Sequence, residues 1–200
     1  MDPLIDRARA FPQRAGLAGR ALDGLATGQS PQALFITCSD SRVVPALITG
    51  ADPGDLFELR TAGNIVPPYR ADTAAGETAT IEYAVDVLAV RDIVVCGHSH
   101  CGAIGAVVRG DDLSVTPAVR SWLRNADPGV LRADGTDVFD PTVAGPVQRH
   151  VLAQLDQLRG YPGIARRLLD GGVRLHGWFY EVHTGLVLAH RADSGLFLPL

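Results

Sequence analysis

The sequence predicts an α/β fold: a mainly parallel central β-sheet flanked by helices, with an antiparallel edge strand or hairpin at the C-terminus and an N-terminal helical arm. Short apolar runs alternate with helical patterns, which is typical of this class. The last two runs are close enough to pair as a hairpin, and residues 3–27 are too broken by proline and glycine for a core helix. With 200 residues, 46% of them hydrophobic, we expect a single domain over residues 1–200 with an arm at 1–27.

Three short runs rich in β-forming residues predict buried parallel strands. They cover Ala33–Thr37, Leu56–Arg60 and Ile93–Cys96, and each is bounded by Gly, Pro or Asp. Residues 174–191 predict two further strands that join through His183-Thr184-Gly185 as an antiparallel pair. The expected sheet is therefore parallel in its centre and antiparallel at one edge.

Helical patterns separate these strands. We expect helices within residues 72–90, directly after Cys101, and over residues 147–158. The apolar faces are Ile81, Ala84, Val85 and Leu88 in the first helix and Val147, Val151, Leu155 and Leu158 in the last. The stretch 111–142 is rich in Asp, Gly and Pro, and predicts a surface excursion with one short helix at 117–126.

Composition narrows the range of partners. The 18 basic and 22 acidic residues are mixed along the chain, so no patch indicates nucleic acid as a partner. The first 14 residues lack an apolar signal region and no stretch is long enough to span a bilayer, which predicts a soluble cytoplasmic protein without membrane contact. A small molecule or another copy of the chain is the expected partner. Three cysteines are too few for a disulfide framework and leave metal binding, catalysis or burial.

Two cysteine-bearing segments follow two of the predicted strands. Cys38 comes directly after the first strand, and "CGHSHCGA" at 96–103 comes at the end of the third. Since parallel strands end at the same edge of a sheet, these loops are expected to meet there. Cys38, His98 and Cys101 then form a Cys₂His set that suits Zn²⁺, with one tetrahedral position left for water or substrate. Such a set predicts a catalytic zinc.

Simpler interpretations exist for the neighbouring residues. A lone cysteine at a strand end is most often a small buried hydrophobe, and Cys96 is expected to face the core. His100 is expected to face solvent or an opposite wall. No partner at ligand spacing accompanies the remaining histidines, which predicts surface or satisfied structural roles for His150, His176, His183 and His190.

The acid and base of "TCSDSR" have two interpretations. Asp40 can cap the following helix while Arg42 lies on the surface. Beside a metal ligand, however, Arg42 can hold the Asp40 carboxylate through a bidentate hydrogen bond. That bond keeps Asp40 off the metal and orients it to accept a proton from water there.

Three motifs together resemble the β-class carbonic anhydrases, zinc enzymes that interconvert carbon dioxide and bicarbonate. They are "CSDSR" at 38–42, "RTAGN" at 60–64 and "GHSHCGA" at 97–103. The resemblance implies one zinc ion per subunit held by Cys38, His98 and Cys101, next to an Asp40–Arg42 catalytic dyad. It also implies reversible hydration of carbon dioxide to bicarbonate and a proton.

The resemblance further implies a substrate pocket and an oligomer. The implied pocket residues are Gln29, Phe57, Ala62, Tyr83 and Gly102. Members of the family form dimers or higher oligomers such as tetramers, so two chains can contribute to one pocket; core packing is the alternative for Phe57 and Tyr83. Thr61 stands where the family commonly has Asn, which changes the hydrogen bonding behind the metal ligands.

Two rival functions stay open at this point. Asp40 as a fourth ligand would close the zinc site, and the chain would then act as a bicarbonate-responsive binding module. Ser99 lies where a nucleophile elbow would place its serine, but Cys101 replaces the second glycine of G-x-S-x-G, which disfavours an acyl hydrolase.

Overall fold

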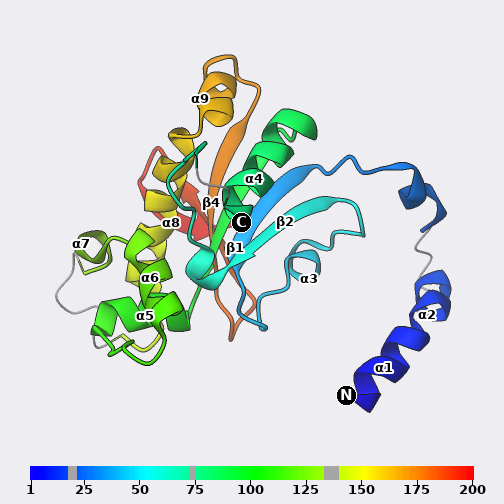
Figure 1. Cartoon of the computed structure of the whole chain (residues 1–200), viewed down its shortest axis with the longest axis horizontal. Helices are drawn as coiled ribbons and strands as arrows, with labels where there is room; N and C mark the ends of the chain where they lie inside the picture. The colour runs from blue at the N-terminus through cyan, green and yellow to red at the C-terminus, as the bar shows by residue number, and fades with distance from the viewer. Residues whose placement is uncertain (18–21, 73–74, 133–139) are drawn as a thin grey trace.

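The computed structural model describes residues 1–17, 22–72, 75–132 and 140–200 (Figure 1). Its strands are β1 (Ala33–Cys38), β2 (Leu56–Thr61), β3 (Asp92–His98), β4 (Arg174–Tyr180), β5 (Val187–Arg191) and β6 (Leu196–Pro199). They form one sheet in the order β2-β1-β3-β4-β5-β6. The first four strands in this order pair in parallel, and β5 and β6 join antiparallel. The predicted fold class is confirmed, although β6 was not expected.

Helices connect the strands and precede the sheet. The α-helices are α1 (Asp2–Arg9), α2 (Phe11–Leu17), α3 (Pro45–Thr49), α4 (Gly76–Glu82), α5 (Gly102–Arg109), α6 (Pro117–Trp122), α7 (Pro128–Leu131), α8 (Ala144–Arg159) and α9 (Pro162–Leu169). Shorter turns are η1 (Asp23–Thr27), η2 (Ala62–Asn64), η3 (Tyr83–Val87) and η4 (Leu123–Asn125). The element η3 is a π-helical turn that continues α4. Helices therefore occur at each predicted place, and α3, α7 and α9 are additional.

The two faces of the sheet are packed differently. On one face, Leu34 and Ile36 of β1 and Ile93 and Val95 of β3 belong to the main buried cluster, together with residues of α4, α5, α8 and α9. On the other face, Phe35, Val94 and Cys96 form a small cluster against partly buried Leu56, Trp178 and Tyr180. Alternation of side chains along β1 and β3 produces this division. The predicted apolar residues of α8, Val147, Val151, Leu155 and Leu158, are all buried.

The segment predicted as a surface excursion differs from expectation. Its residues 133–139 lie outside the described part, but α6, η4 and α7 place Leu123, Ala126 and Leu131 in the core. Trp122 Nε1 also donates a hydrogen bond of 2.8 Å to the carbonyl of Ala62. The segment is therefore a partly buried cover over η2. Its high content of Asp, Gly and Pro masked the few apolar residues that anchor it.

The N-terminal helices lie apart from the sheet in Figure 1. Helix α1 has no buried residue, and its Leu4 and Ile5 are exposed, as is Phe11 of α2. The short helices expected within residues 3–27 are present, except that residues 18–21 are outside the described part. Among the described residues, no helix combines the length and the apolar character that crossing a membrane requires.

Gly97 provides a test of the packing between β3 and α8. A Cβ at this position would overlap Val147 Cγ1 and would lie 2.9 Å from Val151 Cγ2. We expect Gly97→Ala to lower the free energy of unfolding by about 1–3 kcal/mol because it overpacks the core. Chemical unfolding followed by circular dichroism measures this change. Gly76→Ala is the control, since a Cβ there meets nothing within 4 Å; equal stability of the two variants would contradict the packing argument.

Candidate metal centre

Cys38, His98 and Cys101 meet at the carboxyl ends of β1 and β3. One sulfur or nitrogen atom from each residue lies within 4.8 Å of the corresponding atoms of the other two. Cys38 and His98 are the last residues of their strands, and Cys101 immediately precedes α5. All three side chains are buried, with exposed fractions of 6%, 0% and 1%. Two sulfurs and one imidazole at this separation match the donor set of a zinc site.

The imidazole of His98 is oriented by the backbone. Its Nδ1 lies 2.9 Å from the carbonyl oxygen of Ser99, which can only accept a hydrogen bond. Nδ1 therefore carries the proton, and Nε2 has its lone pair free. Nε2 is buried and has no hydrogen-bond partner among the described residues. A buried nitrogen of this kind is costly unless an ion occupies its lone pair, so the residues present fit a bound metal.

The environment of the two thiols favours one negative charge. The Cys101 thiol and, less strongly, His98 and the Gly63 amide lower the pKa of Cys38, although burial opposes this. Gly63 N donates to Cys38 Sγ at 3.3 Å. Conversely, the neighbouring Cys38 and burial raise the pKa of Cys101, while backbone N–H groups at the start of α5 oppose the rise. The pair therefore holds one thiolate readily, and a divalent cation would favour the second.

Asp40 and Arg42 lie beside this cluster, on its solvent-exposed side. Arg42 Nε and Nη2 donate to the two oxygens of Asp40 at 2.9 and 2.7 Å, and the Arg42 backbone N–H donates to Oδ1 at 2.9 Å. Asp40 Oδ2 lies 3.9 Å from His98 Nε2. The hydrogen bond from the Arg42 side chain holds the pKa of Asp40 well below its usual range. The carboxylate is thus an ionised acceptor beside the cluster.

Arg60 has a role that the sequence did not indicate. Its guanidinium donates to the carbonyl of Cys38 at 3.2 and 3.0 Å, to that of Asp40 at 2.8 Å and to that of Val43 at 2.7 Å. These four hydrogen bonds reach three carbonyls of the loop after β1. Arg60 therefore fixes the loop that presents both Cys38 and Asp40.

The residues implied as a substrate pocket fall into two groups. Ala62 and Gly102 are exposed and flank the cluster, since Gly63 contacts Cys38 and Gly102 follows Cys101. Gln29, Phe57 and Tyr83 do not reach this place within one chain.

The paired strands explain that separation. Phe57 lies opposite Leu34, whereas Cys38 lies opposite Thr61, so Phe57 is four residues further back along β2. At about 3.3 Å per residue this amounts to about 13 Å. The Tyr83 ring packs against Phe57 with centroids 5.9 Å apart, and exposed Gln29 precedes the amino end of β1.

The other cysteine and the serine in the motif lie outside the cluster. Cys96 packs with Phe35 and Val94 on the opposite face, and burial raises its pKa to about 12. Ser99 is buried and its Oγ accepts a hydrogen bond of 3.0 Å from Val182 N. The core-facing orientation predicted for Cys96 is confirmed, and Ser99 has a structural bond in place of an exposed nucleophile.

The remaining histidines agree with the structural roles expected for them. His100 is exposed, with Nδ1 3.0 Å from the carbonyl of Pro141. His150 is buried and bonded to Gly63, and His176 Nε2 lies 2.7 Å from Asp92. His183 is exposed, and the His190 ring packs on Phe197.

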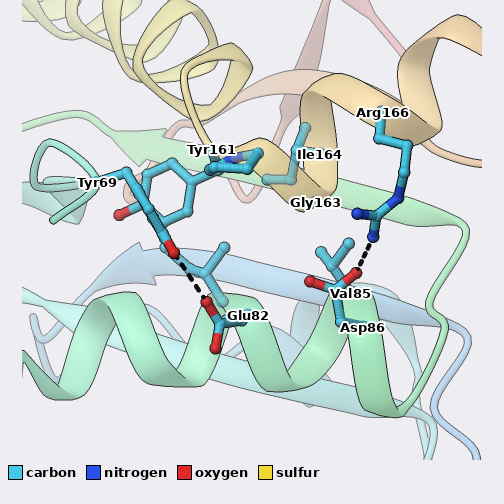
Figure 2. Close-up of a pocket in the computed structure, with 10 residues that line it drawn as sticks. Tyr69, Glu82, Val85, Asp86, Tyr161, Gly163, Ile164 and Arg166 are labelled. Carbon is cyan, nitrogen blue, oxygen red and sulfur yellow. Dashed lines mark hydrogen bonds and ion pairs between the residues drawn. The ribbon is translucent and has the colours of Figure 1, made fainter. Parts of the chain in front are cut away.

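A separate pocket lies between the α4–η3 helix and the start of α9, as Figure 2 shows. Its lining includes apolar Ile81, Val85 and Ile164, and Tyr161 Oη donates a hydrogen bond of 2.7 Å to the carbonyl of Pro67. Tyr69 Oη donates to Glu82 at 3.3 Å, and Arg166 donates to Asp86 at 2.6 Å (Figure 2). None of the three potential metal ligands lines this pocket. The cluster at the carboxyl ends of β1 and β3 is therefore the stronger candidate site.

Known proteins share the sequence and fold around this cluster. The family model described as carbonic anhydrase matches residues 33–187. A carbonic anhydrase of Pseudomonas aeruginosa is 45% identical over 193 residues, which cover 96% of this chain and 86% of the relative. The solved β-carbonic anhydrase CcaA superposes with a TM-score of 0.93 and 38% identity, covering 100% of this chain and 99% of the other. A tetrameric β-carbonic anhydrase of Sordaria macrospora has a TM-score of 0.78 and 31% identity, with 94% of each chain covered.

Replacement of Arg60 tests how the loop after β1 is held. Arg60→Leu removes four hydrogen bonds and leaves carbonyls unpaired, so we expect about 2–3 kcal/mol lower stability toward unfolding. Bound zinc should also exchange faster with a chelator, because Cys38 is held less firmly. Arg124→Leu, at an exposed arginine of η4, is the control. Equal zinc exchange in the two variants would show that Arg60 does not hold the ligand loop.

Proposed function

This chain belongs to the β-class carbonic anhydrases, which interconvert carbon dioxide and bicarbonate, and we propose that the Cys38–His98–Cys101 cluster is its catalytic centre. The observation that carries the proposal is the convergence of three buried donor atoms within 4.8 Å, with His98 Nε2 unpartnered among the described residues. The cluster also lies in the segment that the family model matches.

We propose that these three residues hold one zinc ion per subunit. When bound, zinc supplies a Lewis acid that makes water a sufficiently strong nucleophile at neutral pH. The Ser99 carbonyl fixes the tautomer of His98, and the amides of Gly63 and of the first residues of α5 support the two thiolates. These contacts keep the donor set in its ligand form.

Asp40 then orients the attacking water. Its Oδ1 accepts two hydrogen bonds from Arg42, and its Oδ2 accepts one, which leaves lone-pair capacity on Oδ2 beside His98. A water O–H that donates to Oδ2 has its oxygen directed at the carbon of carbon dioxide. As the water oxygen bonds to carbon, one carbon–oxygen π bond of carbon dioxide and one O–H bond of the water break. Asp40 stays ionised as a hydrogen-bond acceptor, the proton passes to solvent, and bicarbonate leaves.

The same geometry favours an open site over a closed one. Arg42 donates to both Asp40 oxygens and so withdraws charge from them, which weakens Asp40 as a metal ligand while Oδ2 can still accept a hydrogen bond from water. Metal spectroscopy across pH tests this point: a carboxylate bound under all conditions would support the rival binding module.

We also propose a cytoplasmic location, which the three free cysteines support because thiols persist in reducing compartments.

We further propose that two chains complete each site. Gln29, Phe57 and Tyr83 lie toward the amino ends of the strands, away from the cluster of their own chain. Strand β2 forms one edge of the sheet, and Tyr83, which packs on Phe57 of that strand, is 44% exposed. An isologous pairing of two copies at this edge would bring these residues to the partner's cluster.

The N-terminal segment supports the same assembly. We propose that residues 1–27 form an arm that packs on the second copy, because Leu4, Ile5 and Phe11 are exposed on helices that lie apart from the sheet. The tetrameric relative of Sordaria macrospora is consistent with a dimer or tetramer here. Small apolar residues near the cluster, Ala62 and Gly102, would then form the wall on the metal-binding chain.

Asp40→Asn separates catalysis from metal binding. Zinc content should stay stoichiometric, while stopped-flow hydration of carbon dioxide should slow by about 10²–10⁴-fold because the ionised acceptor is lost. Asp111→Asn is a matched control, since Asp111 also forms a two-bond pair with an arginine two residues away, Arg109, on the surface. Wild-type protein that carries zinc but does not hydrate carbon dioxide would refute the proposed function. Unchanged turnover in Asp40→Asn would refute only the role of Asp40.

Subunit mixing tests the shared site. Cys38→Ala and a Gln29→Ala/Tyr83→Ala double variant should each have low activity as pure oligomers. After unfolding and joint refolding at equal amounts, we expect about a quarter of wild-type activity. The reason is that about half of the dimers are mixed, and each mixed dimer regains one of its two sites. Separately refolded proteins combined afterwards are the control. No gain after joint refolding, with mixed dimers verified by mass, would place the whole pocket within one chain.

A further inference from the structure

The turn η2 places a backbone amide on a metal ligand. Gly63 N donates to Cys38 Sγ at 3.3 Å. Gly63 and Asn64 have φ values of 76° and 48°, in the left-handed region that glycine adopts without strain. A Cβ at Gly63 would also lie 3.2 Å from Ala103 Cβ and 3.3 Å from Ile104 Cδ1. Gly63 therefore lies close to the first turn of α5 while its amide faces Cys38, and the direction of the amide depends on what holds the turn.

Helix α8 holds this turn from the other side. His150 is 1% exposed, and its Nε2 lies 2.9 Å from the Gly63 carbonyl. A carbonyl only accepts, so Nε2 is the donor and Nδ1 is an acceptor. Burial lowers the pKa of His150 to about 4, although the hydrogen bond to the Gly63 carbonyl acts in the opposite direction. The ring is therefore neutral near pH 7. One fixed tautomer results.

Gln154 continues the network one helical turn along α8. Its Oε1 accepts from Val66 N at 2.7 Å, so its amide nitrogen faces Nδ1 of His150 at 3.4 Å. Gln154 is also buried, at 3% exposure. The pair is spaced i, i+4 and points to one face. Thr61 Oγ1 closes the turn by donating to the Ile65 carbonyl at 3.0 Å.

We propose that His150 and Gln154 are positioning residues of the metal centre, which hold the Gly63 amide on the Cys38 thiolate and so limit how much charge that sulfur donates to the metal. This inference rests on the proposed function. A hydrogen bond to a thiolate withdraws electron density from sulfur, which leaves the ion a stronger Lewis acid. The Gly63 N–H shares its peptide unit with the Ala62 carbonyl, which Trp122 Nε1 holds, whereas His150 holds the next peptide unit. Loss of the network therefore loosens the amide through rotation about the backbone of Gly63, and the sulfur becomes the stronger donor.

A pair of amide substitutions tests the proposal. In His150→Gln the side-chain nitrogen reaches the former position of Nε2 and can still donate to Gly63. In His150→Asn the amide is one methylene shorter and ends near the former Nδ1. Both variants bury an amide in the same space, so their comparison isolates the bond to Gly63. Gln154→Leu removes the second member of the network.

The readout is the cobalt(II)-substituted protein. In His150→Asn and Gln154→Leu the sulfur-to-cobalt charge-transfer band should move to longer wavelength, because sulfur gives up an electron more easily. His150→Gln should keep the wild-type band. We also expect zinc affinity, measured by chelator competition, to change by about 10–100-fold in His150→Asn and by much less in His150→Gln. The kcat for hydration should fall with little change in KM.

Leu155→Ala is the control for general loss of stability. Leu155 is a buried residue on the same helix that packs near Gly177 of β4, away from η2. It should unfold at a lower denaturant concentration and keep the wild-type band. The inference is overturned if His150→Asn and His150→Gln have the same band and zinc affinity, or if Leu155→Ala shifts the band equally. Both outcomes leave an active wild type, whereas failure of the proposed function appears as wild-type protein inactive with zinc bound.

Discussion

Parallel pairing of β1 with β3 is the constraint on which the site depends. Thr37 lies opposite Cys96, so Cys38 ends its strand level with Gly97, and His98 follows at once. The register also puts Leu34, Ile36, Ile93 and Val95 on the helix-covered face. A slip of one residue would turn these side chains to the other face, so the core that buries them also fixes the spacing of the ligands. Close contact of Gly97 with α8 secures β3 beside that helix.

Most polar groups around the buried Cys38–His98–Cys101 cluster have a hydrogen-bond partner. Arg60 donates hydrogen bonds to three carbonyls of the ligand loop, and the Ser99 carbonyl accepts a hydrogen bond from His98 Nδ1. Arg42 donates two side-chain hydrogen bonds to Asp40, which keep that carboxylate ionised and fix its orientation. What stays without a protein partner among the described groups of the cluster is His98 Nε2. An unpaired buried nitrogen costs about 1–3 kcal/mol, so a metal bound there, as we propose, would also stabilise the fold of this region.

Sequence reasoning recovered the sheet centre and the convergence of the two cysteine loops, because strand runs and motif spacing are local signals. It gave no bounds for α3 and did not expect β6, which have five and four residues, since periodicity needs a longer window. It did not indicate the contacts of Arg60 and His150 for another reason. Arg60 bonds to carbonyls about 20 residues away, and His150 bonds to Gly63, 87 residues away. Such bonds use backbone atoms, which carry no residue identity for a motif to display.

The residues that hold the proposed metal ligands belong to the same chain as those ligands, whereas part of the proposed pocket comes from a second chain. Only the pocket would therefore depend on assembly. Arg60, His150 and Gln154 bond to the ligand loops and the adjoining turn within one chain, so under the proposed function zinc retention would depend on the fold of a single subunit. Phe57 lies about 13 Å along β2 from the level of Cys38. Under the proposed pairing, substrate positioning therefore arises only in the oligomer. Dilution that separates subunits would then lower turnover before it releases zinc, because Arg60, His150 and Gln154 bond to groups of their own chain.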